Sequence, residues 1–258
     1  FSRPTDKQTA MEILVVGAGA MGRWLGGALL EDAPEPVALA FADADPDAAD
    51  AAATQVGGRP VPTDTDEQFD AVCVAVPIPA VPDTVRAYAD NATAAVFDLS
   101  GTMAAPVEAM REAAPDCERL SMHPLFAPAN EPGNVPLVPD SPGPITDAVR
   151  AALDARGNDC FETTVTEHDE AMETVQARTH TAVLAYALAA EEVDDRFHTP
   201  ISSGLDDLAE QVTDGEARVY ADIQLAFDGA DDVADAASEI ADADAVAFER
   251  LYDDAGQR

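Results

Sequence analysis

Residues 13–30, ILVVGAGAMGRWLGGALL, decide the fold of this chain. Four apolar residues predict a buried strand, a glycine-rich turn follows, and the next residues have the composition of a helix. The glycines Gly17, Gly19 and Gly22 have G-x-G-x-x-G spacing. In such a unit the first glycine makes a tight turn, the second lets the backbone approach a pyrophosphate, and the third lets helix and strand pack closely. The stretch therefore predicts a dinucleotide-binding turn, at a helix N-terminus that favours phosphate charge.

Short apolar runs alternate with helix-like segments beyond this turn. Further strands are predicted at residues 37–43, 71–77, 94–100 and 118–124, with another candidate at 135–139. The predicted helices lie at residues 21–33, 45–56, 80–91 and 103–114. Runs that are apolar on both faces suit the strands of a parallel sheet covered by helices. We therefore expect an α/β fold, with a Rossmann-like doubly wound parallel sheet over residues 11–165.

The pattern changes after residue 165. Residues 166–192 have a helical period, and the segment TAVLAYALAA at 181–190 is apolar almost all round, as is typical of a helix buried in a core or an interface. We expect an all-helical C-terminal domain over residues 166–258 that contributes to substrate binding and forms a homodimer. Burial of the apolar helix within its own subunit is the alternative. We expect residues 1–10 to form a flexible tail, with a leader segment as the alternative.

The composition is strongly acidic, with 50 Asp and Glu against 14 Lys and Arg and a formal net charge of −36. Because the acids are spread along the chain, we interpret them as a solvated surface adapted to a salt-rich, halophile-type cytoplasm, in which salt screens the self-repulsion. A surface for a basic partner is the alternative. Without a basic patch we expect no nucleic-acid partner, and without a long apolar run we expect no membrane span.

The three cysteines are scattered and lack C-x-x-C spacing. Each lies in an apolar or strand-like context, so we expect reduced thiols. We predict no metal site and a cytoplasmic protein, since the N-terminal residues also lack the apolar core of a signal peptide.

The acid expected at the cofactor is Asp43, where the second predicted strand ends about 20 residues after the glycines. Its carboxylate would accept hydrogen bonds from the adenosine ribose hydroxyls and would repel a 2′-phosphate, and no arginine lies beside it. We therefore expect NAD, with NADP less favoured. Asp45 is the alternative acid if the strand ends later.

Other residues complete the predicted cofactor site. Ala18, Ala20 and Met21 lie between the glycines of the phosphate-binding turn. Val76 and Pro77 end the strand predicted at 71–77, at a turn that lies along the cofactor in such domains. We expect these two residues near the adenosine or its ribose, with packing at the strand end as the alternative.

His123 ends another predicted strand, within SMHPLFAP at residues 121–128. In an open α/β sheet the reactive end of a dinucleotide lies outside the C-terminal ends of the strands, and Pro124 biases the preceding backbone toward extended geometry. A histidine, with an ordinary pKa of about 6.5, suits removal of the proton from a secondary alcohol. We interpret His123 as this base, with a capping or packing histidine as the alternative.

Four segments occur in one order: GAGAMG at 17–22, DLSG at 98–101, HPLFAP at 123–128 and TEHDEAME at 166–173. Together they resemble the prephenate/arogenate dehydrogenase family of tyrosine biosynthesis, and the resemblance covers nearly the whole chain from residue 11. It implies an NAD(P)-dependent enzyme that oxidises a ring hydroxyl and releases the ring carboxylate as CO2. The implied substrate is prephenate, with arogenate as the alternative.

The resemblance also implies roles for residues. His123 has the position of the family histidine that accepts the hydroxyl proton, and His168 matches the second family histidine. His168 and Gln176 share one face of the predicted long helix, with His180 at its edge, so we expect these residues to face the substrate. The alternatives are a bond from His168 to a neighbour in the first helical turn and simple packing of His180.

Two positions depart from the family pattern. Many members have Ser-Val-Lys after the fifth strand, where this chain has Gly101, Thr102 and Met103. We expect Ser100 or Thr102 to supply the missing hydroxyl, with Gly101 also lining the substrate site. Many members have an arginine for the substrate carboxylate where this chain has Ser203.

A dicarboxylate substrate still requires positive charge, and a bidentate arginine is the natural choice. Arg178 on the predicted long helix is the first candidate, followed by Arg196, Arg218 or an arginine of a partner subunit. Two other functions stay open at this point. One is a different dehydrogenase of the same two-domain architecture, acting on a hydroxyacid or an imine, and the other is a non-enzymatic NAD-responsive binding protein.

Overall fold

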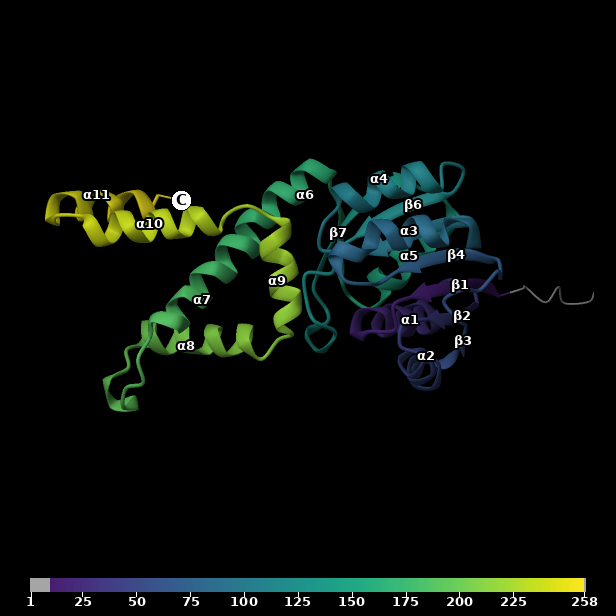
Figure 1. Ribbon diagram of the computed structural model, residues 1–258, viewed down its shortest axis with the longest axis horizontal. Coiled ribbons are helices and arrows are strands. Elements are labelled where there is room, and N and C mark those ends of the chain that lie inside the picture. Colours follow the sequence, from purple (N-terminus) through teal and green to yellow (C-terminus); the bar gives the residue numbers. More distant parts are fainter. Residues whose placement is uncertain (1–9, 258) are drawn as a thin grey trace, which may run out of the picture. The chain divides into compact units, whose positions relative to one another are not determined.

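The computed structural model describes residues 10–257, and the chain divides into two compact units. The first unit ends at Asp169 and the second begins at Glu170. Apart from residue 10, the predicted N-terminal tail lies outside the described residues. Figure 1 shows the sheet with its helices in the first unit and only helices in the second.

The first unit is built on one eight-stranded sheet in the order β3-β2-β1-β4-β5-β6-β7-β8. Its strands are β1 Met11–Val16, β2 Val37–Ala42, β3 Arg59–Pro60, β4 Phe69–Val74, β5 Ala92–Leu99, β6 Glu118–Met122, β7 Asn134–Ser141 and β8 Asp159–Glu162. The strand order reverses between β1 and β4, which places a crevice outside the carboxyl ends of these two strands. The predicted Rossmann-like architecture is confirmed.

Helices cover both faces of this sheet (Figure 1). They are α1 Ala20–Asp32, α2 Pro46–Ala52 continued by a π-turn Ala53–Gly57, α3 Val81–Tyr88, α4 Ala104–Ala113 and α5 Pro144–Ala155. One apolar core contains side chains of α1, α2 and α5, and the other contains side chains of α3 and α4. The alternation along each strand assigns its side chains to the two cores in turn.

The sheet departs from the expected parallel arrangement at β7, which runs antiparallel to β6. A parallel return needs a crossover of a dozen or more residues, usually a helix. Residues 123–133 between these strands contain only the short 3₁₀ turn Pro128–Asn130, so the chain reverses directly. The candidate strand at 135–139 is part of β7, whereas β3, α5 and β8 were not predicted.

Helices and the loops between them make up the described residues of the second unit. Helix α6, Val165–Met172, passes from the first unit into a π-turn, Glu173–Arg178, and then into α7, Thr179–Ala189. The remaining elements are a 3₁₀ turn Asp195–Phe197, α8 Pro200–Thr213, α9 Ala217–Ala226, α10 Ala230–Asp242 and α11 Ala245–Ala255. None of the helices in the described part of the chain is both long and apolar enough to cross a membrane.

Helix α7 is more exposed than its composition suggests. Only Val183 of this helix is buried, and Leu188 is 88% exposed. Hydrogen bonds nevertheless tie the helix to its unit, from Thr181 to Gln224 of α9 and from Tyr186 to Asp206 of α8. Burial within its own subunit, the alternative considered for this segment, therefore does not account for its apolar residues.

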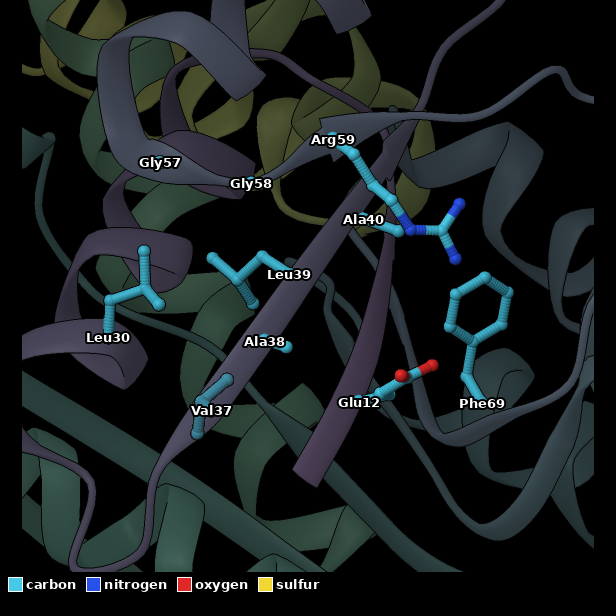
Figure 2. Close-up of a pocket in the computed structure, with 10 residues that line it drawn as sticks. All are labelled: Glu12, Leu30, Val37, Ala38, Leu39, Ala40, Gly57, Gly58, Arg59 and Phe69. Atoms are coloured by element: carbon cyan, nitrogen blue, oxygen red, sulfur yellow. The ribbon is translucent and has the colours of Figure 1, made fainter. Parts of the chain in front are cut away.

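A pocket of about 450 Å³ lies along the outer edge of β2 (Figure 2). Its lining includes Glu12 near the start of β1, Val37 at the start of β2, and Arg59 of β3. These residues belong largely to the N-terminal ends of the strands, whereas the glycine-rich turn follows the C-terminal end of β1. The pocket is therefore separate from the crevice expected to hold a dinucleotide.

Candidate active site

The glycine-rich turn after β1 has the geometry that its sequence predicts. Gly17 has a φ of +102°, and a Cβ atom at this position would lie 2.3 Å from the Ala75 carbonyl oxygen. A Cβ atom at Gly22 would lie 2.0 Å from the Gly17 oxygen. Around Gly19, in contrast, a Cβ would meet no atom within 4 Å. Two glycines are thus required by packing, and the third leaves space where a phosphate can approach the backbone.

Helix α1 begins directly after this open glycine. Gly19 is its N-cap residue, and within the described structure the cap provides no side-chain hydrogen bond and the first turn contains no acid. The first N–H groups of the helix are therefore available to an anion. Arg23 donates from Nη1 to the Ala18 carbonyl at 2.9 Å, which places a cation beside the turn. A role for Arg23 was not predicted from the sequence.

Asp43, which follows β2, is tied to the turn. Its Oδ2 accepts a hydrogen bond from the Ala18 N–H at 2.7 Å, and its Oδ1 accepts one from the Asp45 N–H at 2.9 Å. Asp45 instead caps α2, accepting from the Asp47 N–H at 3.1 Å. Because a carboxylate has about four acceptor sites, Asp43 can also accept bonds from ribose hydroxyls. Of the two acids considered, Asp43 is the one bonded to the glycine turn.

The other expected cofactor residues surround this turn. Ala18 is fully buried, whereas Ala20 is exposed and Met21 is half-buried. Val76 is beside Gly17, since its Cγ1 atom would lie 3.1 Å from a Cβ at that glycine. Pro77 is exposed and precedes the 3₁₀ turn Ile78–Ala80. Val76 therefore borders the candidate cofactor crevice directly.

His123 follows β6 at the C-terminal edge of the sheet. Its N–H donates to the Pro136 carbonyl of β7 at 3.1 Å, which fixes the backbone, and the residue is buried. Its Nδ1 atom lies 3.0 Å from Nε2 of His168. His168 is also buried and belongs to α6. The structure thus brings together the two histidines that the sequence analysis selected.

Asp169 extends this pair into a chain of three residues. Its Oδ1 lies 2.8 Å from His168 Nδ1 and accepts the Met103 N–H at 3.0 Å, while its Oδ2 accepts the Ala104 N–H at 3.2 Å. The two amides belong to the start of α4. Burial acts to raise the pKa of Asp169, but the hydrogen bonds from His168 and from the Met103 amide together lower it. Asp169 is therefore an ionised carboxylate, and the sequence analysis did not identify it.

The ionised carboxylate determines which ring nitrogens carry protons. Asp169 can only accept, so His168 donates from Nδ1 and its Nε2 is an acceptor when the ring is neutral. His123 then donates from Nδ1 to His168, which leaves Nε2 of His123 as the unprotonated nitrogen. Burial and the neighbouring His168 lower the pKa of His123, so this ring is neutral at neutral pH and can receive a proton at Nε2.

The loop at residues 100–103 is next to the basic nitrogen. A Cβ atom at Gly101 would lie 3.7 Å from His123 Nε2 and 2.8 Å from Cδ1 of Ile78. Ser100 Oγ accepts the Thr102 N–H at 3.2 Å and lies 3.3 Å from Thr102 Oγ1. Gly101 therefore faces His123, while the two neighbouring hydroxyls are bonded to each other. Ile78 forms an apolar wall here that the sequence analysis missed.

The other expected substrate residues belong to the second unit. Arg178 is paired with Asp232, at 2.6 Å from Nη2, and with Glu173 at 3.3 Å. His180 packs edge-on against Tyr220, with ring centroids 4.8 Å apart, and burial lowers the pKa of His180. Gln176 is half-buried in the π-turn. A substrate carboxylate would have to compete with two acids for Arg178.

The two further arginines considered for the substrate carboxylate are also paired with acids. Arg196 binds Asp194 at 2.8 Å, and Arg218 lies 3.9 Å from Asp222. Ser203, at the position where many family members have an arginine, belongs to α8. Each of the three arginines considered for the substrate carboxylate therefore already has an acidic partner.

Comparisons with known proteins decide the family. No family model matches the chain. A 4-amino-4-deoxyprephenate dehydrogenase from Streptomyces pristinaespiralis is 31% identical over 239 residues, covering 84% of this chain and 78% of the relative. The chain belongs to the prephenate dehydrogenase family. It is therefore an NAD(P)-dependent dehydrogenase, as the ordered motifs led us to expect.

Solved structures agree in fold with this family assignment. Prephenate dehydrogenase from Aquifex aeolicus, in complex with hydroxyphenyl propionate and NAD+, superposes with a TM-score of 0.67 at 15% identity, covering 90% of this chain and 87% of that one. Arogenate dehydrogenase from Synechocystis has a TM-score of 0.63 at 18% identity, covering 96% and 98% of the two chains. The prephenate dehydrogenase family thus shares both the sheet and the helical unit described above.

Proposed function

We propose that this enzyme catalyses the NAD-dependent oxidative decarboxylation of prephenate to 4-hydroxyphenylpyruvate. The observation that carries the proposal is the hydrogen-bonded chain from His123 through His168 to Asp169. It ends in an acceptor nitrogen at the edge of the sheet where a dinucleotide presents its reactive ring. Arogenate, which also carries a ring hydroxyl, is the alternative substrate.

In this proposal His123 Nε2 accepts the proton of the ring hydroxyl. The imidazolium that forms donates from Nδ1 to His168, and the negative charge of Asp169 offsets the new positive charge. When the ring loses CO2 and becomes aromatic, His123 returns the proton to the oxygen, so the base is restored. Aromatisation makes the loss of CO2 downhill, and no further acid or metal is needed for that step.

The residues at the glycine turn fit an NAD molecule. Gly19 and the first amides of α1 would hold the pyrophosphate, and Asp43 would accept bonds from the adenosine ribose hydroxyls. When bound, NAD accepts the hydride of the substrate. The carboxylate of Asp43 would repel a 2′-phosphate, which favours NAD over NADP.

The remaining substrate contacts are assigned as follows. Gly101 faces the base and gives the ring space, and Ser100 or Thr102 offers a hydroxyl to it. Gln176, Arg178 and His180 of the second unit are the candidates for the other polar groups of the substrate. To bind a substrate carboxylate, Arg178 would have to give up at least one of its hydrogen bonds to Asp232.

A second candidate reaction is the oxidation of 4-amino-4-deoxyprephenate, because the 31% identical relative has that activity in its name. The base offers one acceptor nitrogen in a buried, uncharged histidine ring. Such a group matches a neutral hydroxyl, whereas an ammonium would bring a full charge and three donors into a buried site. We therefore favour the hydroxyl substrates.

Purified enzyme assayed for NADH formation with each of the three substrates tests the proposal. We interpret the acidic surface as an adaptation to a salt-rich cytoplasm, so the assay is run in multimolar KCl. We expect turnover of prephenate or arogenate, and loss of turnover in His123→Asn with NAD binding retained. Turnover of the amine alone would reject the hydroxyl substrates, and NAD binding without turnover of any of the three would reject the proposal.

We further propose a homodimer formed through the helical unit. Large apolar side chains of that unit are exposed in the single chain, among them Leu188 at 88%, Leu225 at 85% and Ile201 at 78%. Exposed apolar residues in this number mark a surface that is covered in solution. Light scattering during gel filtration in high salt measures the mass directly. A single-chain mass would reject the dimer while leaving the proposed reaction intact.

A further inference from the structure

Asp98 at the end of β5 is a fully buried carboxyl group that the reaction outlined above does not use. It is in register with Val74 of β4 on one side and Ser121 of β6 on the other. Its Oδ1 accepts the Ser100 N–H at 2.9 Å. It thus lies directly below the loop at residues 100–103.

The surroundings of Asp98 are short of hydrogen-bond donors. The hydroxyl of Ser121 donates to Met103 Sδ at 3.0 Å. Turned toward Asp98 instead, it would favour the ionised form, but burial outweighs this effect. Among the described residues, no donor reaches Asp98 Oδ2. An ionised carboxylate would therefore leave a charged oxygen unsatisfied in an apolar layer, which is costly. A protonated carboxyl would instead point its O–H toward the Ser121 oxygen.

The electrostatics agree with this geometry. Burial raises the pKa of Asp98 to about 8, against the opposing effect of Ser121 and of the Ser100 amide. The titratable group that interacts with Asp98 from the neighbouring strand is the Cys73 thiol of β4, which is fully buried. Burial first, and Asp98 second, raise the pKa of Cys73, so this neighbour is neutral as well.

The loop held by Asp98 contacts both ends of the hydrogen-bonded chain His123–His168–Asp169, which we call the proton relay. Ser100, bonded to Asp98, accepts the Thr102 N–H, and Gly101 between them faces His123 Nε2. The loop continues to Met103, whose amide binds Asp169 at the far end of the relay. A shift of the Ser100 backbone would therefore displace Gly101, which lies beside His123, and also the Met103 amide that donates to Asp169.

We propose that Asp98 is a positioning residue that works as a neutral carboxylic acid. It holds the loop at residues 100–103 against His123 and adds no negative charge beside the relay. The catalytic consequence rests on the proposed function, whereas the protonation state does not. Two independent measurements therefore test the two parts.

The first measurement compares Asp98→Asn with wild type in thermal unfolding between pH 5 and pH 8, in high salt. An unfolded Asp98 is ionised above its ordinary pKa of 3.8, whereas the folded one keeps its proton up to about pH 8. Wild type therefore loses stability as the pH rises through this window, while the amide does not titrate. We expect Asp98→Asn to be at least as stable as wild type, by a margin in Tm that grows with pH.

Asp140→Asn is the matched control. Asp140 is an acid of β7 whose side chain is 6% exposed, and its oxygens accept from Arg111 Nε at 2.7 Å and Arg119 Nε at 2.8 Å. Burial acts to raise the pKa of Asp140, but its bonds to the two arginines lower it. Its stabilising effect is present above its ordinary pKa and is lost as the pH falls. We expect Asp140→Asn to be less stable than wild type near neutral pH, with a difference that shrinks in acid.

The second measurement is turnover. Asn at position 98 keeps an acceptor for the Ser100 amide and offers N–H toward Ser121, so we expect kcat within about threefold of wild type. Asp98→Leu keeps the branching at Cγ but replaces both oxygens by larger methyl groups and so removes the acceptor, and we expect kcat to fall on the order of tenfold or more with the KM for NAD unchanged. Rescue by Asn and not by Leu separates positioning from a general structural role.

Each result decides the proposal. Destabilisation of Asp98→Asn like that of Asp140→Asn, without a margin that grows with pH, would show an ionised Asp98 and overturn it. Normal turnover in a folded Asp98→Leu would overturn the positioning role. If wild type turned over none of the three substrates, the proposed function would fail, and the unfolding series would still decide the protonation state.

Discussion

Nδ1 of His123 lies 3.0 Å from Nε2 of His168, and neither ring is appreciably exposed. Two buried imidazoles in hydrogen-bond contact cannot both be charged without strong repulsion. The contact is stable because Asp169 accepts a hydrogen bond from Nδ1 of His168, which leaves Nε2 of His168 as the acceptor for His123. This arrangement determines which nitrogen of His123 is the base, and the predictions about catalysis follow from it.

Replacement of Asp169 by Asn tests the origin of this arrangement. The amide can donate to His168 Nδ1, which permits the wrong tautomer and removes the charge that offsets the imidazolium. We expect kcat to fall on the order of 10²-fold or more, with NAD binding unchanged in a titration. Asp147→Asn, at an exposed acid of α5, is the control and should keep full activity. Normal turnover in Asp169→Asn would show that the carboxylate is dispensable.

The pH dependence of kcat/KM tests the state of the base. Because burial and His168 lower the pKa of His123, the ring stays unprotonated below the ordinary histidine pKa of 6.5. We therefore expect activity to persist as the pH falls through 6.5, with the loss that belongs to His123 at lower pH. An acid limb at or above that value, assigned to His123 by NMR titration of the folded enzyme, would contradict this description.

The nucleotide preference is expected to depend on Asp43. In Asp43→Ser the bonds to the Ala18 amide and to the ribose hydroxyls weaken, so the KM for NAD should rise on the order of tenfold. The discrimination against NADP should shrink, because the repelling charge is gone. Asp45→Ser, which keeps a capping side chain for α2, should leave both values unchanged. Equal effects of the two substitutions would remove Asp43 from the cofactor site.

Substitutions at two glycines of the turn should distinguish an effect on cofactor binding from an effect on stability. Gly19 has a φ of −69°, which alanine adopts, and a Cβ there meets no protein atom. Gly19→Ala should therefore change the free energy of unfolding by less than about 1 kcal/mol yet weaken NAD binding, because its methyl group occupies the approach to the pyrophosphate. Gly22→Ala places a Cβ 2.0 Å from the Gly17 oxygen and should lower stability by about 1–3 kcal/mol. Unchanged NAD affinity in Gly19→Ala would contradict the assignment.

The sequence predicted the elements whose signals are local. Five strands with clear apolar runs (β1, β2, β4, β5 and β6), the helices between them and the glycine turn follow from patterns within a few residues of one another. The two-residue strand β3 carries no such signal. The direction of β7 was not predictable in this way, because a mixed apolar and proline run looks the same in either direction. It follows from the short connection between His123 and Gly133, which leaves no room for a crossover helix.

The candidate site likewise combines residues that local sequence indicates with contacts that only the fold brings together. His123 and His168 were selected by residue type and by resemblance, but their contact bridges 45 positions. The role of Asp169 depends on two amides at the start of α4, more than 60 positions away, and no spacing rule reveals such a bond. Asp98 belongs to the DLSG segment but received no predicted role, because a single acid at the end of an apolar run gives no indication of its partners. Side chains that act through distant backbone groups become visible only in the folded chain.

The central claim is that His123 accepts the proton of a ring hydroxyl, and one comparison tests it most directly. NADH formation from prephenate and from arogenate is measured in multimolar KCl for wild type and for His123→Asn, with NAD binding measured in parallel. We predict that wild type turns over at least one of these substrates, and that the variant binds NAD normally but loses turnover on the order of 10²-fold or more. Equal turnover by the two proteins would contradict the claim.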